Sequence, residues 1–419
     1  MKYRARVAIQ TLGCKLNQAE SESLACRLIK GGHIIVDADE KPDVYILNSC
    51  TVTHVADRKC RNLIRRACKL NPQAKIVAMG CYAGRSTEEL NRIDGIDFLA
   101  NGQDGFDLIE MINLIDLPRA VEIGQSRLSR TRSFIKIQEG CDTPCTYCIV
   151  PQVRGKETSL DPEDILGEIC ERTSAGFLEV GLTGTKVGAY AYNGISLKDL
   201  IEQILKATDV KRLRLSSLQP LEVTDNLLSL WSDRRLCSHF HIPLQSGCQN
   251  VLGRMGRRYT TKQYEESISF IRERVPGVAI TTDIMVGFPG ETEDEHKESM
   301  SFCREMEFAA MHVFPYSSRP NTPATKIVGQ VGGKEKRSRK AEMLKLAVQS
   351  ARRFRERLIG HTKPVLWEVN VSGRDDTWSG LTDNYIRVMT RSKEPLSNRI
   401  TMAKLESCKN GEVWGTIGQ

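Results

Sequence analysis

The first 315 residues alternate short apolar runs with longer helical runs, and this alternation restricts the fold more than any other feature of the sequence. Parallel strands need a crossover connection, usually a helix, so a strand–helix–strand rhythm predicts a parallel sheet covered by helices. In the N-terminal part, the expected strands are residues 6–12, 33–36, 44–48 and 75–79, and the expected helices are residues 18–30, 57–70 and 86–91. These elements predict an α/β domain with a parallel sheet over residues 1–125.

The same rhythm repeats six times in the middle of the chain. The expected strands are residues 134–138, 177–182, 212–216, 239–243, 279–286 and 310–314, and helical runs between them include residues 162–173, 197–207, 262–274 and 293–306. Six β/α units predict a partial (β/α)6 barrel over residues 126–357. In folds of this kind the chemistry takes place at the C-terminal ends of the strands.

The last part of the chain, residues 358–419, has a different pattern. Short β-rich runs at residues 364–371, 379–382, 386–389 and 411–417 are separated by turns. Short strands of this number and spacing predict a small β-barrel, so the whole chain is expected to be an α/β protein with a C-terminal β-barrel.

Three cysteines stand close together directly after the first strand of the six-unit segment. Cys141, Cys145 and Cys148 form a C-x3-C-x2-C pattern, and clustered thiolates need a cation because they repel one another. A structural zinc site takes four protein ligands, and no fourth Cys or His lies nearby. A four-iron cluster held by three cysteines leaves one iron open for a substrate. An iron–sulfur cluster is therefore favoured over a zinc loop or buried thiols.

A second set of three cysteines is spread along the N-terminal part. Cys14, Cys50 and Cys81 each follow an expected strand of the parallel sheet. Ligand sites form at the carboxyl edge of such sheets, so three soft ligands could meet there and hold a second cluster. Widely spaced cysteines are often incidental, but their shared position after strands favours a metal site. The other eight cysteines have no expected function, since buried free Cys behaves as a small hydrophobe.

Positive charge is concentrated in two stretches of a chain whose net charge is +8. Eleven Lys or Arg and only three Glu lie between Lys326 and Leu358. Residues from Lys334 onward form an expected helix whose apolar side consists of Met343, Leu344, Leu346, Val348 and Leu358. A second basic cluster lies near the N-terminus, at Arg58, Lys59, Arg61, Arg65, Arg66 and Lys69. Such clusters are either solvated helix faces or surfaces that bind nucleic-acid phosphates.

Compartment and membrane association follow from what the sequence lacks. No run of about 18 apolar residues is present, and the first residues do not resemble a signal peptide. We therefore expect a cytoplasmic protein with no membrane partner. In the cytosol its 14 cysteines indicate metal or redox chemistry rather than disulfides.

These motifs resemble the methylthiotransferases of the radical S-adenosylmethionine superfamily over essentially the whole chain. The resemblance is carried by residues 11–17, 48–53 and 79–82, by residues 140–155, 241–247, 283–292 and 316–324, and by residues 383–386, which resemble a TRAM domain, an RNA-binding β-barrel. The resemblance implies that the middle segment is a radical S-adenosylmethionine barrel.

The resemblance implies two [4Fe-4S] clusters and two molecules of S-adenosylmethionine. Cys141, Cys145 and Cys148 would hold the cluster whose open iron chelates S-adenosylmethionine and splits it to a 5′-deoxyadenosyl radical. Cys14, Cys50 and Cys81 would hold the auxiliary cluster that carries the sulfur. A cofactor must supply this chemistry, because no side chain can homolyse an aromatic C–H bond. An electron donor such as a flavodoxin or ferredoxin is also implied.

Further residues are candidates for binding S-adenosylmethionine. Several lie at or just after strand ends, where a cap or turn role is the alternative, and an aromatic side chain next to a cluster cysteine could pack on the adenine. The candidates are Tyr147, Thr183, Gly184, Ser217, Gln245, Arg257 and Asp283. His239 and His241 form a His-x-His pattern that barrel metallohydrolases also use. A metal site of that kind needs further His or Asp ligands, and the chain has only seven histidines, so structural or cofactor-contact roles are expected.

The branch of the family decides the expected substrate. Residues 50–53, 56–59 and 214–218 look like the threonylcarbamoyladenosine branch, although Gln219 and Cys60 depart from its pattern. We therefore expect methylthiolation of carbon 2 of N6-threonylcarbamoyladenosine at position 37, in the anticodon loop of tRNA. The alternatives are N6-isopentenyladenosine in tRNA, a ribosomal-protein aspartate, or a non-enzymatic zinc protein that binds RNA. The threonylcarbamoyl carboxylate needs an Arg or Lys partner, which the sequence does not identify.

Overall fold

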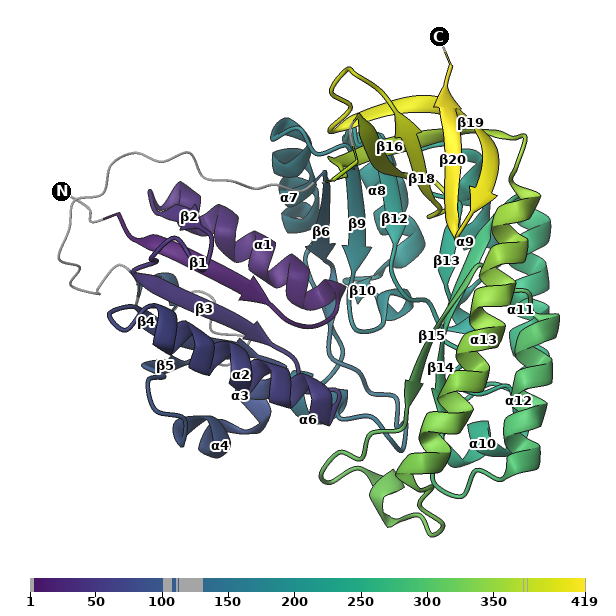
Figure 1. Cartoon of the computed structure of the whole chain (residues 1–419), viewed down its shortest axis with the longest axis horizontal. Coiled ribbons are helices and arrows are strands. Elements are labelled where there is room, and N and C mark those ends of the chain that lie inside the picture. The colour runs from purple at the N-terminus through teal and green to yellow at the C-terminus, as the bar shows by residue number, and fades with distance from the viewer. Residues whose placement is uncertain are drawn as a thin grey trace.

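The computed structural model describes residues 4–100, 108–110, 112, 131–371, 373–374 and 376–418. The N-terminal α/β layer lies beside the central β/α segment, and a small barrel caps one end of that segment (Figure 1). This arrangement has the expected α/β fold class with a C-terminal β-barrel. The expected boundary between residues 125 and 126 lies outside the described residues.

The N-terminal part is a five-stranded parallel sheet in the order β2-β1-β3-β4-β5. Its strands are β1 (Arg6–Thr11), β2 (Ile34–Val36), β3 (Val44–Ser49), β4 (Lys75–Gly80) and β5 (Phe98–Leu99), and its helices are α1 (Lys15–Lys30), α2 (His54–Leu70), α3 (Cys81–Arg85) and α4 (Thr87–Asn91). The central strand β3 is buried along its whole length, which explains its continuous apolar run. The strands expected at residues 6–12, 33–36, 44–48 and 75–79 are confirmed within one residue at each end.

The central segment contains the six expected parallel strands. They are β6 (Arg132–Lys136), β9 (Glu179–Thr183), β12 (Arg212–Leu215), β13 (His239–His241), β14 (Ala279–Val286) and β15 (Ala310–Pro315). They form two three-stranded sheets, β6-β9-β12 and β13-β14-β15, joined by single parallel bridges that include Ser217 to His241. Among the strands that the structure describes, β6 and β15 do not pair, so the barrel is partial and stays open between them.

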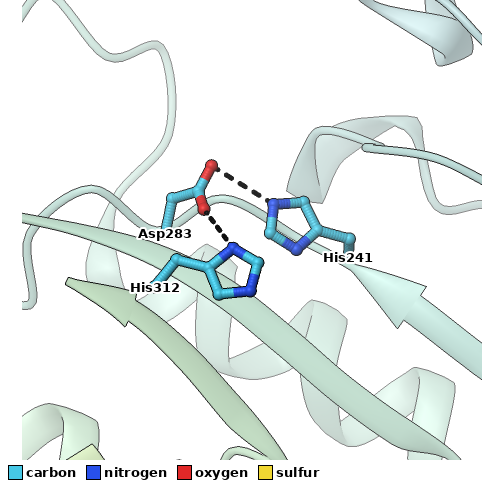
Figure 2. Close-up of side chains that lie close together, drawn as sticks. All are labelled: His241, Asp283 and His312. Atoms are coloured by element: carbon cyan, nitrogen blue, oxygen red, sulfur yellow. Dashed lines mark ion pairs between the residues drawn. The ribbon is translucent and has the colours of Figure 1, made fainter. Parts of the chain in front are cut away.

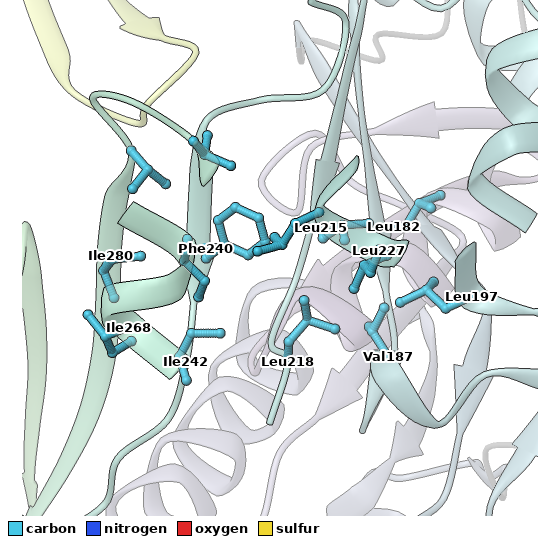
Figure 3. Packing of buried hydrophobic residues seen from close by; sticks show 14 of the residues in the cluster. Leu182, Val187, Leu197, Leu215, Leu218, Leu227, Phe240, Ile242, Ile268 and Ile280 are labelled. Carbon is cyan, nitrogen blue, oxygen red and sulfur yellow. The ribbon is translucent and has the colours of Figure 1, made fainter. Parts of the chain in front are cut away.

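Helices cover the outside of this barrel. The main ones are α7 (Pro162–Ser174), α8 (Leu197–Ala207), α11 (Thr261–Arg274) and α12 (Glu293–Glu305), and shorter elements are β7 (Gln138–Glu139), α6 (Val150–Arg154), β8 (Thr158–Ser159), β10 (Ala191–Tyr192), β11 (Ile195–Ser196), α9 (Asp225–Leu228) and α10 (Gln249–Arg254). Figure 3 shows apolar side chains of the strands, such as Leu182, Leu215 and Phe240, packed together with Leu197 and Ile268 of the helices. Because side chains alternate along a strand, the opposite face of the same strands can carry polar groups.

A long helix leads from the partial barrel to the C-terminal barrel. Helix α13 (Gly333–Arg357) packs against β15 and buries Met343, Leu346 and Phe354. The assignment of Leu344 and Val348 to its apolar side is wrong, since their side chains are 40% and 65% exposed. Each lies about 100° around the helix from a buried neighbour, which turns it toward solvent.

The C-terminal part is a closed five-stranded barrel in the order β16-β17-β18-β20-β19. Its strands are β16 (Thr362–Asn370), β17 (Thr377–Thr382), β18 (Arg387–Arg391), β19 (Arg399–Lys409) and β20 (Glu412–Ile417). Strand β19 was not expected, because its fully buried positions are only Ala403 and Leu405. No helix of the described residues is long and apolar enough to cross a membrane.

Candidate active site

Three cysteines meet at the carboxyl edge of the N-terminal sheet. Cys14 is the N-cap residue of α1 just beyond β1, Cys50 follows β3, and Cys81 follows β4 as the first residue of α3. Burial raises the pKa of Cys50 to about 12, and the neighbouring thiols of Cys81 and Cys14 act in the same direction. The structure therefore brings together three thiols that are far apart in the sequence.

Polar side chains and one glycine fix this edge. Asn17 donates hydrogen bonds to the Oδ1 of Asn48 (2.8 Å) and to the carbonyl of Ser49 (3.2 Å), so the turns after β1 and β3 are tied together. Gly80 has φ +87° and ψ −165°, and a Cβ there would lie 2.6 Å from the carbonyl oxygen of Ser49 and collide with Asn48. This backbone conformation is essentially restricted to glycine. The residues around the three cysteines thus set the path of each turn.

The second set of cysteines lies in the loop between β7 and α6. Backbone N–H groups donate to two of the sulfurs, from Thr143 to Cys141 and from Val150 to Cys148, both at 3.4 Å. Gly140 begins the loop at φ +74°, where a Cβ would collide with the carbonyl of Lys156. Backbone donors stabilise thiolates, which is what a metal-ligating loop requires.

Arg257 and Tyr147 lie beside this second set. Arg257 donates to the Sγ of Cys145 (3.4 Å), to Gln219 and to the hydroxyl of Tyr259 (3.1 Å). Burial raises the pKa of Tyr147 far above its ordinary value, and its electrostatic neighbours include Arg257. Two of the expected S-adenosylmethionine contacts are therefore adjacent to the cysteine loop.

The other expected contacts lie at or after the ends of β9, β12 and β13, except Asp283, which was expected at a strand end but lies in the middle of β14. Thr183 is buried, and the space that a Cβ on Gly184 would need is filled by Gln138, so this glycine serves packing within the barrel. Ser217 lies in the bridge to β13. Gln245 has φ +69°, and its buried Oε1 has no hydrogen-bond partner among the described residues. Such an unpaired acceptor is costly and fits a site that awaits a ligand.

Asp283 is the centre of a triad with His241 and His312. Figure 2 shows both imidazoles pointing at its carboxylate, with His241 Nε2 at 3.2 Å from Oδ2 and His312 Nδ1 at 3.3 Å from Oδ1. Burial opposes ionisation of Asp283, but the hydrogen bonds from the two imidazoles outweigh it and hold its pKa well below the ordinary range. The hydrogen bond to Asp283 raises the pKa of His312, which burial and the charge of Lys15 oppose. His239 stacks on Tyr385 instead, so the two histidines of the His-x-His pattern have different roles.

Charged residues line the inner face of the partial barrel, which we call the barrel lumen. Glu179 pairs with Arg212 (2.9 Å) and with Arg214 (2.8 Å), and all three side chains are almost fully buried. Arg212 and Arg214 donate further to carbonyls of the C-terminal barrel, from Leu381 to Asp383. The C-terminal barrel therefore closes the N-terminal end of the lumen.

Sequence reasoning missed two residues that join the parts of the site. Arg154 of α6 donates to the Sγ of Cys81 (3.2 Å) and pairs with Glu20 and Glu139, so it connects the loops of the two cysteine sets. Lys15 reaches into the lumen, where its Nζ lies 5.9 Å from the ring centroid of Phe134 and 5.7 Å from that of Tyr385. Both residues stand inside the motifs that carry the family resemblance, which was the signal that could have revealed them.

The spacing of the sulfurs tests which metal the two sets fit. Tetrahedral zinc with Zn–S bonds of about 2.3 Å would bring its sulfur ligands to about 3.8 Å from one another. Within the described part of the chain, neither set of cysteines has all three sulfurs within 4.8 Å of one another. All 14 cysteines are free of disulfides. Neither set is therefore arranged around a single zinc ion, and three free thiols in each set are the ligands that a [4Fe-4S] cluster with one open iron requires.

Comparisons with known proteins identify the class. The model of "Uncharacterized protein family UPF0004" matches residues 6–101, and that of the "Radical SAM superfamily" matches residues 135–303. The chain is similar in fold to the radical S-adenosylmethionine methyltransferase TsrM from Kitasatospora setae, with 16% identity and a TM-score of 0.55 over 76% of this chain and 77% of that one. The fold and the cysteine loop therefore define a radical S-adenosylmethionine enzyme.

Curated relatives identify the family. Threonylcarbamoyladenosine tRNA methylthiotransferase MtaB of Bacillus subtilis is 35% identical over 96% of this chain and 94% of its own length, and the protein of the same name from Thermotoga maritima is 34% identical over 98% of each. The tRNA-2-methylthio-N(6)-dimethylallyladenosine synthase of Thermodesulfovibrio yellowstonii is 34% identical over 90% of each. This chain belongs to the methylthiotransferase family of radical S-adenosylmethionine enzymes. Members use S-adenosylmethionine with a [4Fe-4S] cluster and carry a second cluster.

Proposed function

We propose that this enzyme transfers a methylthio group to carbon 2 of N6-threonylcarbamoyladenosine at position 37 of tRNA. Three relatives named for this nucleoside align with 91–98% of the chain at 34–35% identity. Relatives named for the dimethylallyl nucleoside reach 30–34% identity, so identity alone separates the two substrates poorly.

The observation that favours the threonylcarbamoyl nucleoside is the cationic lumen. Lys15, Arg132 and Arg214 gather around Tyr385 there. Arg132 and Arg214 already pair with Glu368 and Glu179. Lys15 has no ion pair in the described part of the chain, so an apolar dimethylallyl group would leave its charge uncompensated, whereas a threonylcarbamoyl group brings a carboxylate. The runner-up substrate remains N6-isopentenyladenosine.

Cluster ligation is assigned to the two sets of cysteines. Cys141, Cys145 and Cys148 would hold the radical-generating [4Fe-4S] cluster, and Cys14, Cys50 and Cys81 the auxiliary one. When bound, the clusters and S-adenosylmethionine supply the electron transfer, radical and sulfur chemistry. The domains that divide this work are residues 1–125, 126–357 and 358–419.

The remaining residues bind and orient the cofactor and the substrate. Arg257, beside Cys145, offers a cation for the carboxylate of S-adenosylmethionine, and the unpaired Oε1 of Gln245 offers an acceptor for its ammonium group. Further contacts are assigned to Tyr147, Thr183, Gly184, Ser217 and Asp283. Arg154 fixes the distance between the two cysteine sets, so that the radical and the sulfur act on one bound adenine.

The test uses the holoenzyme reconstituted anaerobically with iron and sulfide. Three transcripts of one tRNA, carrying N6-threonylcarbamoyladenosine, N6-isopentenyladenosine or adenosine at position 37, are incubated with S-adenosylmethionine and a reductant. We expect the methylthio nucleoside from the first transcript only, measured by mass spectrometry of digested tRNA. Product from the isopentenyl transcript alone would overturn the proposal.

A further inference from the structure

A threonylcarbamoyl group ends in a carboxylate, and an enzyme that selects this group has to pair that charge. A buried carboxylate without a cation is strongly unfavourable. The cation that pairs with this carboxylate must lie near the auxiliary cysteines. Carbon 2 of the adenine has to reach the sulfur held there, and the threonylcarbamoyl group is attached to N6 of the same ring. This step rests on the proposed function.

Most cations of the lumen are already neutralised. Arg214 and Arg212 share Glu179, Arg132 pairs with Glu368 (2.6 Å), and Lys136 pairs with Glu139 (2.9 Å). Arg154 is held between Glu20 and Glu139. A second acid would find each of these positions occupied.

Lys15 differs from them. No ion pair joins it to a carboxylate in the described part of the chain, and Glu179, which acts on it from a distance, is already held by two arginines. Its Nζ lies over the rings of Phe134 and Tyr385, which hold an ammonium group in place but leave its charge unneutralised. As the residue after Cys14, it is fixed next to the auxiliary site.

An imidazole of β15 lies within electrostatic range of Lys15. The side chain of His312 is 69% exposed, its Nδ1 is engaged by Asp283, and its charge and that of Lys15 influence each other. Because Nδ1–H donates to Asp283, Nε2 is turned away from Asp283 and carries a proton to donate only when the ring is an imidazolium, the form that Asp283 favours by raising the pKa of His312. Lys15 lies over Phe134 of β6 and His312 belongs to β15, so an ammonium group and an imidazole lie at the two strands that border the opening of the partial barrel.

We propose that Lys15 pairs with the carboxylate of the threonylcarbamoyl group, that Nε2 of His312 donates a second hydrogen bond to it, and that this pair selects the substrate. Lys15 is then a specificity residue that belongs to the N-terminal domain although it acts inside the barrel. The same segment places the sulfur-carrying cluster and reads the group that marks the correct adenine.

The test compares binding of anticodon stem-loops to the reconstituted holoenzyme. The stem-loops carry N6-threonylcarbamoyladenosine, its methyl ester or adenosine at position 37, and the ester keeps the size of the group but removes its charge. Wild type should bind the acid about 10–100-fold more tightly than the ester, the range of one charge-assisted hydrogen bond. Lys15→Met should lose most of this preference, because only the hydrogen bond from His312 remains, and Lys15→Arg should keep most of it. Lys30→Met, at the exposed end of the same helix, should behave as wild type.

The outcomes separate the two proposals. If wild type neither prefers nor modifies the threonylcarbamoyl stem-loop, the proposed function fails and this inference fails with it. If wild type modifies it and Lys15→Met still prefers the acid over the ester as strongly as wild type, only the inference is overturned. Iron content and the electron paramagnetic resonance spectrum verify that Lys15→Met keeps both clusters. If Lys15→Met loses a cluster, the binding of the acid and of the ester is compared in Lys15→Gln and His312→Phe instead.

Discussion

At the scale of single residues, the turn that presents Cys81 depends on the absence of a side chain. Gly80 adopts a conformation that other residues reach only at a cost of about 1–3 kcal/mol, and the neighbouring Ser49 and Asn48 leave no room for a Cβ. The strain would fall on the cysteine that follows immediately.

We therefore expect Gly80→Ala to lose the iron of the auxiliary site and to keep that of the site at Cys141, Cys145 and Cys148. Gly84→Ala is the matched control, because a Cβ there meets only one atom, the carbonyl oxygen of Val153, at 4.0 Å. The measurement is the iron content per chain of both variants after reconstitution. Equal iron in Gly80→Ala and wild type would show that the turn tolerates a side chain.

At the scale of elements, helix α13 separates its structural face from its charged face. Met343, Leu346 and Phe354 are buried, whereas Lys345, Arg352 and Arg353 are exposed. The buried face holds the helix against β15 regardless of charge, and the exposed cations, of which Arg352 also pairs with Glu356 (2.7 Å), face solvent where they can contact phosphates.

Reversal of Lys345, Arg352 and Arg353 to Glu should weaken tRNA binding much more at low salt than at high salt. Each lost phosphate contact should also reduce the slope of log Kd against log salt by about 0.7–0.9. The control reverses Lys262, Arg274 and Lys297 on α11 and α12, with the same change in charge. Equal affinities for wild type and the α13 variant at every salt concentration would make the helix a linker only.

Elements with clear periodicity could be predicted from the sequence, and side-chain partners could not. Strand β3 and the six strands of the partial barrel have lengths and apolar patterns that identify them in the sequence. In β19 apolar and polar residues alternate too weakly for the strand to be recognised. Cys141, Cys145 and Cys148 stood out by their spacing, and Cys14, Cys50 and Cys81 because each follows a strand. The contacts of Arg154 with Cys81 and of Arg319 with Asp57 join residues 73 and 262 positions apart, and only packing of separate domains creates them.

At the scale of the whole molecule, buried side chains tie the three parts of the chain to one another. Arg319 belongs to the loop after β15, and its side chain is 1% exposed. It pairs with Asp57 (2.7 Å) and donates to the carbonyl of Thr51 (2.9 Å), the residue after Cys50. Arg154 makes the corresponding connection to Cys81, and Tyr385 of the C-terminal barrel closes the lumen against His239. The two cysteine sets are therefore held relative to each other by side-chain contacts between the N-terminal sheet and the partial barrel.

Two independent clusters on one rigid frame lead to a stoichiometric expectation. Wild type should contain about eight irons and eight acid-labile sulfides after anaerobic reconstitution, and each triple Ala variant, of Cys141/Cys145/Cys148 or of Cys14/Cys50/Cys81, should contain about four. Cys170→Ala/Cys408→Ala, which removes two thiols away from both sets, should keep all eight. About four irons in wild type, unchanged by the loss of Cys14, Cys50 and Cys81, would leave the enzyme without a cluster to carry sulfur. A radical enzyme of that kind could activate a C–H bond but could not place a methylthio group on the resulting carbon, so the proposed reaction would have to be abandoned.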